Sequence, residues 1–448
     1  MLRRPFDLSP AQALAASISG LVAAGTILLA LPFSSTGRPL GWVDALFTST
    51  SAVCVTGLVV VDTPKDLTLA GQLVVMLLIQ AGGLGYMTIT TVVAMALGKR
   101  LSLRDRLTLQ EALNLQTGEG LVQFTLGVLR LTLVFELAGA LLLTLWWWGD
   151  MGLGRAAYSG LFHSVSAFNN AGFALFSDSL IGFRSDVVVN LVISTLFICG
   201  GLGFVVLQDL IRLKRVTRLS LHTRFVLVLT AALTLGGTLM IYVLERGNPA
   251  TLGTVSQGEA WMAAYFQSVT TRTAGFNSLN LADLHGATLF VMMVLMFIGA
   301  SPGGTGGGVK TTTFGITVAA LWATIRGDDE TVLFKRRLAP ALVARAFFIS
   351  LIAFLALNVV AGLLLIQERL PLMHVLFETT SAFGTVGLSI GAADRPLSLA
   401  GDFSASAKLL IVAMMFAGRV GPLTLAVALA QRRQKPRLRY PEGTVLIG

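Results

Sequence analysis

The sequence predicts an all-α integral membrane protein in which eight spanning helices form four repeated units. Charged residues make up only 12% of the 448 residues, about half the share found in soluble domains. Long apolar runs recur, as at 121–148 and 341–366, and about 20 such residues span a bilayer as a helix. A short motif ending in glycine also occurs four times. These features exclude a soluble enzyme, a disordered chain, a fibrous repeat and a disulfide scaffold.

The distribution of basic residues predicts the topology. Most of the 33 Lys and Arg residues lie in clusters at the ends of apolar runs, which argues against nucleic-acid binding; the clusters are Arg3/Arg4, Lys99–Arg106, Arg212–Arg224, Arg326–Arg345 and Arg432–Arg439. The positive-inside rule places them in the cytoplasm, so we expect a bacterial cytoplasmic-membrane protein with both termini inside. The alternate loops carry acids such as Asp62 and Asp178. An acidic outer face would attract cations, although outer loops also look acidic simply because they lack basic residues.

Each stretch between two cytoplasmic clusters fits two full crossings. Both ends of the stretch lie on the same side of the membrane, so the number of crossings is even. A shorter apolar segment, too short to span the bilayer, remains between the two crossings. We therefore expect four units and a C-terminal tail: 1–106, 107–218, 219–337 with a broken second helix, 338–440 and 441–448.

The leftover segments resemble one another. Each has an aromatic residue, then hydroxyl residues, then a glycine followed by Leu or Phe; the segments are 46–58, 161–173, 265–276 and 376–388. The third is one residue shorter between its Phe and its glycine. Four copies at near-regular spacing are not expected by chance. They predict a helix–pore-helix–loop–helix unit repeated around a pseudo-fourfold pore.

Backbone chemistry suggests what such loops do. Irregular backbone at membrane depth is tolerated only where it lines a cavity or is buried in protein, and rings of carbonyl oxygens replace the water shell of an ion. Glycine allows the positive φ that turns a carbonyl inward, and the C-terminal end of each short helix favours a cation. No carboxylate directly precedes the glycines, which favours a monovalent ion over Ca²⁺ or Mg²⁺. The expected ion-binding residues are Val55, Thr56, Gly57, Asn170, Ala171, Gly172, Thr273, Ala274, Gly275, Thr385, Val386 and Gly387.

At these four motifs the chain resembles the Trk/Ktr/HKT superfamily of potassium transporters, over essentially its whole length. The runs 79–85 and 199–204 also look like the starts of that family's packed second helices. In some plant relatives the first glycine is serine, which accompanies Na⁺ transport. All four glycines are present here, so the resemblance implies K⁺ bound at the carbonyl oxygens of a selectivity filter.

The ending at 440–448 resembles that of Ktr membrane subunits, and the chain has no room for the extra N-terminal helices of many Trk members. The resemblance therefore implies K⁺ uptake by a homodimer with one pore per subunit, bound to a cytosolic nucleotide-binding regulatory ring of RCK type. Sodium ion is a further candidate as activator, and no organic cofactor is expected in this chain. A Na⁺-coupled K⁺ symporter or a Trk-type subunit remains the alternative.

A glycine-rich interruption at 301–313 divides an apolar stretch that is too long for one helix. Its thirteen residues include five glycines, which disfavour a helix, and its backbone must avoid lipid. We expect a gate beneath the filter, as family members have, formed by Gly303, Gly304, Thr305, Gly306, Gly307, Gly308, Lys310 and Arg419. A static break is the alternative. A phosphate-binding loop fits poorly, because Val309 intrudes in the motif and no strand precedes it.

Two arginines lie at membrane depth, where charge is costly and usually functional. Arg419 is expected to repel the ion or to tether the interruption through its carbonyls, unless it pairs away from the pore. Arg272 is expected to point behind the third loop, with Glu378 as its partner. The histidines have no metal-ligand spacing and no catalytic constellation appears, so we do not expect an enzyme.

Overall fold

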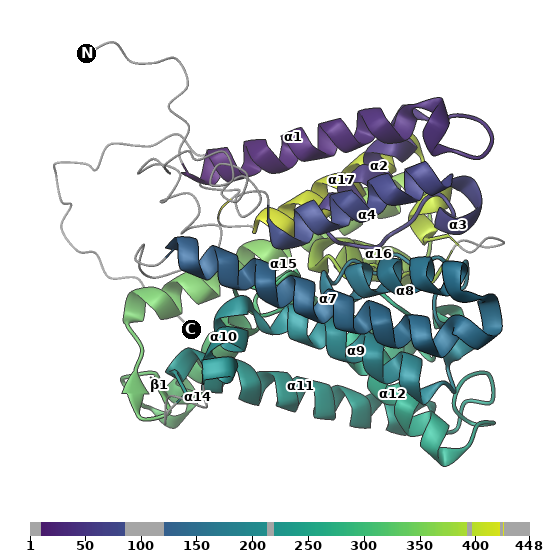
Figure 1. Ribbon diagram of the computed structural model, residues 1–448. Helices are drawn as coiled ribbons and strands as arrows, with labels where there is room; N and C mark the ends of the chain where they lie inside the picture. Colours follow the sequence, from purple (N-terminus) through teal and green to yellow (C-terminus); the bar gives the residue numbers. More distant parts are fainter. Residues whose placement is uncertain (1–9, 86–120, 213–218, 392–396, 422–423, 425–448) are drawn as a thin grey trace, which may run out of the picture.

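The computed structural model describes residues 10–85, 121–212, 219–391, 397–421 and 424. The expected all-α fold is confirmed in this part of the chain, which is predominantly helical (Figure 1). The strands described there form one small antiparallel hairpin of β1 (Val332–Leu333) and β2 (Arg336–Arg337).

The helices follow one another in a recurring order of a first helix, a short helix that ends in a loop, and a second helix. The first set is α1 (Pro10–Ala30), α2 (Trp42–Val53) and α4 (Leu69–Leu84), with η1 (Pro32–Ser34) and α3 (Thr63–Asp66) in its connections. The next is α7 (Leu121–Met151), α8 (Leu153–Phe168) and α9 (Val187–Leu202), with η2 (Ile181–Phe183) before α9 and α10 (Phe204–Arg212) after it.

The second half of the chain continues in the same order. The third set is α11 (Leu221–Glu245), α12 (Gln257–Thr270), η3 (Leu281–Asp283) and a second helix in two parts, α13 (Gly286–Phe297) and α14 (Thr311–Arg326). The fourth is α15 (Pro340–Glu368), α16 (Leu372–Gly384), η4 (Leu399–Asp402) and α17 (Ala405–Val420). The break in the third set covers residues 298–310, close to the expected 301–313.

Four of the described helices are long and apolar enough to cross a membrane, namely the first helix of each set, α1, α7, α11 and α15. Of these, α1, α7 and α11 run nearly parallel in Figure 1. The pair α9 and α10 passes the same test as one span bent by 100°, whereas α4 and α13 are shorter apolar helices. The count of eight spans and the unit boundaries stay predictions.

Glycines let the second helices pass close against the short helices. A methyl group added to any of three glycines would collide with a carbonyl oxygen at the end of a short helix: Gly82 with Val53, Gly200 with Phe168 and Gly418 with Phe383. The interpretation of 79–85 and 199–204 as helix starts is therefore wrong. Both runs end helices, because Gly85 and Gly203 adopt φ of 79° and 94°, a conformation that terminates a helix.

The four short helices are buried in the protein, and the first helices face outward. The phenylalanine of each motif is fully buried: Phe47, Phe162, Phe266 and Phe377. On α7, by contrast, Leu133, Val134 and Leu137 are each more than half exposed. An apolar surface of this kind fits contact with lipid.

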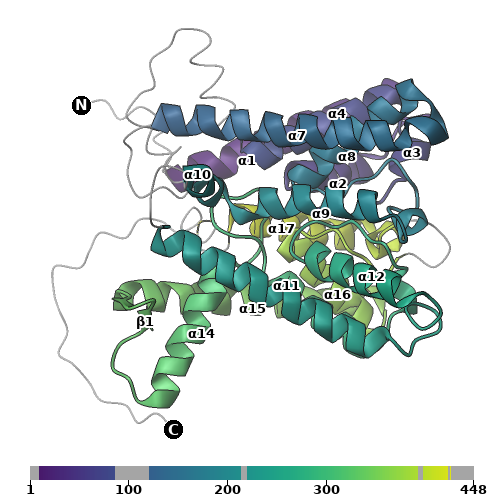
Figure 2. The same ribbon diagram turned by 60° about the horizontal axis from the view of Figure 1, so that its bottom comes forward.

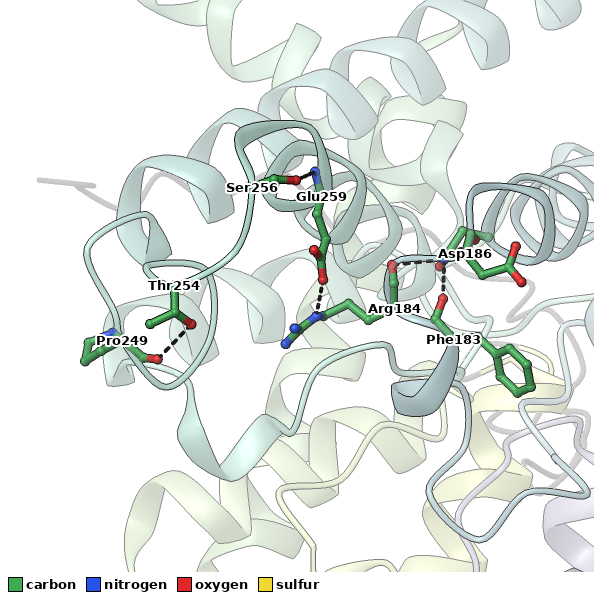
Figure 3. Close-up of polar contacts among 8 residues, drawn as sticks. Phe183, Arg184, Asp186, Pro249, Thr254, Ser256 and Glu259 are labelled. Carbon is green, nitrogen blue, oxygen red and sulfur yellow. Dashed lines mark hydrogen bonds and ion pairs between the residues drawn. The ribbon is translucent and has the colours of Figure 1, made fainter.

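The two ends of the bundle are formed by different elements. The helix α3, with Asp62 at its N-cap, lies at one end, and α10, α14 and the basic hairpin lie at the other (Figures 1 and 2). At the α3 end, an ion pair of 2.8 Å between Arg184 and Glu259 ties the connection after α8 to α12 (Figure 3). Ser256 caps that helix by accepting a hydrogen bond from the Glu259 amide at 3.3 Å.

Candidate functional site

The loops that end the four short helices meet in a closed ring. We call residues 55–57, 170–172, 273–275 and 385–387 the glycine loops. A methyl group added to the glycine of each loop would run into the carbonyl oxygen just before the glycine of the next: Gly57 onto Ala171, Gly172 onto Ala274, Gly275 onto Val386 and Gly387 onto Thr56. Motifs that are more than 100 residues apart in the chain therefore lie side by side.

The glycine loops share an unusual backbone. Each glycine has a positive φ, between 70° and 92°, and so has the residue two positions before it: Val55 (50°), Asn170 (58°), Thr273 (71°) and Thr385 (51°). Left-handed conformations are uncommon for residues other than glycine. Such strain persists only where the surrounding structure holds it in place, and it clusters at functional sites.

A hydroxyl residue near the end of each short helix holds the loop that follows. The residue before each glycine donates its N–H to the backbone oxygen of this hydroxyl residue: Thr56 to Ser51 (2.8 Å), Ala171 to Ser166 (2.8 Å), Ala274 to Thr270 (3.0 Å) and Val386 to Ser381 (2.9 Å). The Ser51 and Ser381 hydroxyls also accept from the amides of Gly57 and Gly387. Those of Ser166 and Thr270 donate to the carbonyls of Phe173 and Phe276.

The carbonyl oxygens of the glycine loops stay unused. Among the described residues, none of these oxygens accepts a hydrogen bond. Buried carbonyls normally have partners, and carbonyl oxygens are suitable ligands for a permeating cation. The loops therefore offer a ring of backbone acceptors of the kind a dehydrated cation needs.

A cavity of about 410 Å³ opens on one side of the ring, and we call it the outer cavity. All four loop glycines line it, together with Asp62 and Asp178. Asp62 is buried and forms an ion pair of 3.3 Å with Lys65. The exposed Asp178 is therefore the acid that makes the approach to the glycine loops attractive to cations.

The backbone between α13 and α14, residues 298–310, passes against the other side of the ring; we call it the Gly-rich segment. It contacts the left-handed residues of three loops. The Thr305 hydroxyl donates to Asn170 Oδ1 at 2.8 Å, and the Gly307 amide donates to Thr385 Oγ1 at 2.9 Å. A methyl group at Gly306 would collide with the Thr273 side chain. The predicted gate residues thus lie directly beside the predicted filter residues.

Two cationic side chains donate to carbonyl oxygens of the Gly-rich segment, Arg419 from α17 and Lys310 from the segment itself. Arg419 in α17 donates to the carbonyl oxygen of Thr305 and to those of Gly82 and Gly83 at the end of α4. Lys310 donates to the Gly306 carbonyl at 2.6 Å. Arg419 therefore links the segment to two other elements, which is the tethering geometry expected from the sequence.

The suggested pairing of Arg272 with Glu378 is wrong. Arg272 instead donates to Thr311 Oγ1 at 3.1 Å, at the start of α14. Glu378 accepts from the Ser389 hydroxyl at 2.6 Å and from the Ala400 amide at 3.0 Å. Sequence spacing does not reveal this separation, because it depends on which faces of α12 and α16 turn toward each other.

The sequence indicates that Glu136 pairs with neighbouring residues or snorkels, but it does not identify its partners, which form a polar cluster behind the second glycine loop. Glu136 in α7 accepts from Asn169 Nδ2 at 2.8 Å and from Gln80 Nε2 at 3.2 Å. Asn169 directly precedes Asn170 and also donates to Gln80 Oε1 at 3.0 Å. An acid in an apolar helix is itself a signal of a buried partner, and here the partners are Asn169 at the end of α8 and Gln80 in α4.

Comparison with known proteins agrees with this geometry. Residues 12–438 match the sequence pattern of the TrkH family, which is described as a family of cation transport proteins. The chain belongs to the TrkH family of cation transport proteins. This is a family of transporters and not of enzymes, as the sequence indicated. In the described part of the chain, no group of His, Cys, Asp and Glu residues is suited to hold a metal ion.

Relatives in this family cover nearly the full chain. The Ktr system potassium uptake protein B of Bacillus subtilis (strain 168) is 41% identical over 440 residues, which are 98% of this chain and 97% of the relative. The potassium/sodium uptake protein NtpJ of Enterococcus hirae is 38% identical over 452 residues and 98% of each chain. The crystal structure of the potassium transporter TrkH from Vibrio parahaemolyticus shares the fold, with a TM-score of 0.74 at 18% identity, over 96% of this chain and 87% of that one.

Proposed function

We propose that this chain takes up potassium ions across a bacterial cytoplasmic membrane, as the ion-translocating subunit of a Ktr-type system. The observation that carries the proposal is the closed ring of glycine loops, whose carbonyl oxygens are free and whose glycines line the acidic outer cavity. The name of the 41% identical relative, a potassium uptake protein, supports K⁺ as the ion.

In this proposal the glycine loops form the selectivity filter. A cation enters the outer cavity past Asp62 and Asp178, and carbonyl oxygens replace its water. The filter residues are those predicted from the sequence, 55–57, 170–172, 273–275 and 385–387. The short helices α2, α8, α12 and α16 add a favourable field, because each ends at its own loop with its partly negative end.

The Gly-rich segment is the gate in this proposal. It lies against the glycine loops through Thr305 and Gly307 and is tethered by Arg419. Two cationic side chains on this path oppose the passage of a second cation. Release of the tether moves the segment, with Lys310, away from the glycine loops and lets the ion pass.

The proposed assembly is a homodimer in which each subunit contains a pore, with a cytosolic nucleotide-binding ring of RCK type as regulator. The word "system" in the name of the Bacillus relative supports a partnered subunit. The name of the Enterococcus relative includes sodium. It supports Na⁺ as an activator, and it keeps a Na⁺-coupled K⁺ symporter as the second candidate.

Ion flux tests the proposal and separates the two candidates. The full chain is expressed in a bacterial strain that lacks K⁺ uptake, and growth on low K⁺ is measured. The purified protein is then assayed in proteoliposomes with Na⁺ absent, equal on both sides, or as a gradient. We expect growth, and K⁺ flux without a Na⁺ gradient. Flux only with a Na⁺ gradient would support the symporter, and absence of both growth and flux would overturn potassium uptake.

A further inference from the structure

One position behind the glycine loops is polar in all four short helices. It directly follows the buried phenylalanine of each motif and is occupied by four different residues: Thr48, His163, Gln267 and Glu378. At each of them at most 1% of the residue's surface is exposed. A buried polar side chain is costly unless it is hydrogen-bonded, so the partners of these residues indicate what each one does.

Glu378 joins α16 to the chain that follows the fourth glycine loop. Its carboxylate oxygens accept from the Ser389 hydroxyl at 2.6 Å and from the Ala400 amide at 3.0 Å. Ser389 lies two residues after Gly387, and its oxygen in turn accepts from the Leu399 amide at 2.8 Å. One carboxylate therefore ties the outer side of this loop to its own short helix and to η4.

His163 plays the same part for the second loop. Its Nδ1 lies 2.8 Å from the Ser159 carbonyl, which only accepts, so Nδ1 carries the proton. Its Nε2 is then free to accept from the Leu175 amide at 3.2 Å, three residues after Gly172. The ring is held in this orientation by stacking on Phe176, with centroids 4.9 Å apart, and by the edge of Trp147.

The equivalent residues behind the first and third loops make no such connection. The Thr48 hydroxyl and both polar atoms of the Gln267 amide have no hydrogen-bond partner among the described residues. These two positions therefore do not hold the chain that follows their loops.

The chain that follows the first and third loops is held instead by the chain that follows their neighbours. After the first loop, Val59 exchanges two hydrogen bonds of 2.9 Å with Ser398, two residues from the Ala400 that Glu378 binds. After the third loop, the Asn277 carbonyl accepts from Leu180 at 3.0 Å, and its amide donates to Ser179 at 3.2 Å. Both Ser179 and Leu180 belong to the chain that follows the second loop.

We propose that Glu378 and His163 are positioning residues for ion selection, and that each one serves two glycine loops. Glu378 fixes the fourth loop directly and the first through Ser398. His163 fixes the second loop directly and the third through Ser179 and Leu180. This inference rests on the proposed function, because it assigns these residues to the K⁺ filter.

The test compares Glu378→Gln with the wild-type full chain in proteoliposomes, and the readout is the ratio of K⁺ to Na⁺ flux. Glutamine keeps the size of the side chain but replaces one acceptor oxygen with an amide nitrogen, which donates. The Ser389 oxygen already accepts from the amides of Gly391 and Leu399, so it has no lone pair left for this nitrogen and the Ser389 bond is lost. The chain after the fourth loop then loses its link to α16, so we expect the ratio to fall about tenfold or more.

Two controls separate positioning from general damage. Thr48→Val removes the hydroxyl at the equivalent position of the first helix, where it has no partner, and should leave the ratio at the wild-type value. Glu245→Gln changes another fully buried carboxylate, which accepts from Asn248, Thr251, His285 and Thr288 away from the loops. It should lower the thermal melting temperature without changing the ratio.

His163→Phe gives a second, independent variant, which keeps an aromatic ring and removes the acceptor for Leu175. A lower ratio in the folded Glu378 and His163 variants, with both controls at the wild-type ratio, supports the inference. An unchanged ratio in either folded variant overturns it, as does an equal loss in Thr48→Val. If Glu378→Gln does not fold, His163→Phe decides. A wild-type chain without preference for K⁺ would instead overturn the proposed function itself.

Discussion

Two stretches of irregular backbone lie next to each other in the centre of this protein and are held in opposite ways. In the glycine loops, the residue before each glycine donates its N–H to a backbone oxygen of the preceding short helix, only four or five positions earlier in the chain. In the Gly-rich segment the amides of Ser301 and Thr305 bond to α9, and that of Gly308 bonds to α17.

The two stretches therefore differ in what their conformation depends on: the glycine loops depend on their own short helices, and the Gly-rich segment depends on the packing of several helices. A loop that is bonded to its own short helix keeps its shape whenever that helix is buried. A segment bonded to separate elements keeps its place only while those elements stay together. The same contrast supports our proposal of a rigid filter in the glycine loops and a moving gate in the Gly-rich segment.

The largest expected effect follows from Gly57→Ser, which distorts the first glycine loop. A Cβ atom at this position would lie 2.5 Å from the Ala171 carbonyl oxygen, and the φ of 92° is strained for serine. Such strain costs about 1–3 kcal/mol, so we expect the K⁺ to Na⁺ flux ratio to fall at least about tenfold. Flux measured in proteoliposomes with each ion checks this.

Gly258→Ser is the matched control for that substitution. Gly258 lies in α12, and an added Cβ would meet nothing within 4 Å. Its flux ratio should equal that of the wild type. A wild-type ratio in Gly57→Ser would show that the ring does not select the ion.

An intermediate effect is expected from Arg419→Gln, which acts on the Gly-rich segment. The substitution removes the links from α17 to Thr305 and to the end of α4. Because hydrogen bonds to a charged group are worth about 1.5–3 kcal/mol, we expect K⁺ flux to rise several-fold while the K⁺ to Na⁺ ratio stays unchanged.

Arg326→Gln is the control for Arg419→Gln. It also removes an arginine, but Arg326 is exposed and lies at the end of α14. Its flux should stay at the wild-type level. If Arg419→Gln leaves flux unchanged or lowers it, the segment is a static break and not a gate.

The smallest effect is expected from the double variant Asp62→Asn, Asp178→Asn, which removes the carboxylates of the outer cavity. Surface charges raise the local cation concentration, an effect that salt screens over about 10 Å at 0.1 M. We expect the half-saturating K⁺ concentration to rise about twofold at low ionic strength and the change to vanish in high salt. Asp328→Asn, at the opposite end of the bundle, should change neither quantity.

Much of this site could be predicted from the chain because the information is local. The hydroxyl residues and the glycines recur within a dozen residues of each other, so the motif specifies a loop that follows a short helix. The positive φ of the residue two positions before each glycine is a property of the structure that residue type does not indicate. The partners of Glu378, Glu136 and Arg272 could not be predicted, since each depends on how separate helices rotate against one another. The runs at 79–85 and 199–204 were misread for the same reason, because their glycines serve contacts with distant short helices.

Hydropathy and motif spacing already specify a helical membrane protein with four similar glycine motifs, because both are properties of the chain alone. The closure of these motifs into one ring, the position of residues 298–310 against it, and the bonds that join the chain after the first and third loops to its neighbours arise only on folding. Those facts depend on contacts between residues far apart in the chain, which packing brings together and which no local pattern specifies.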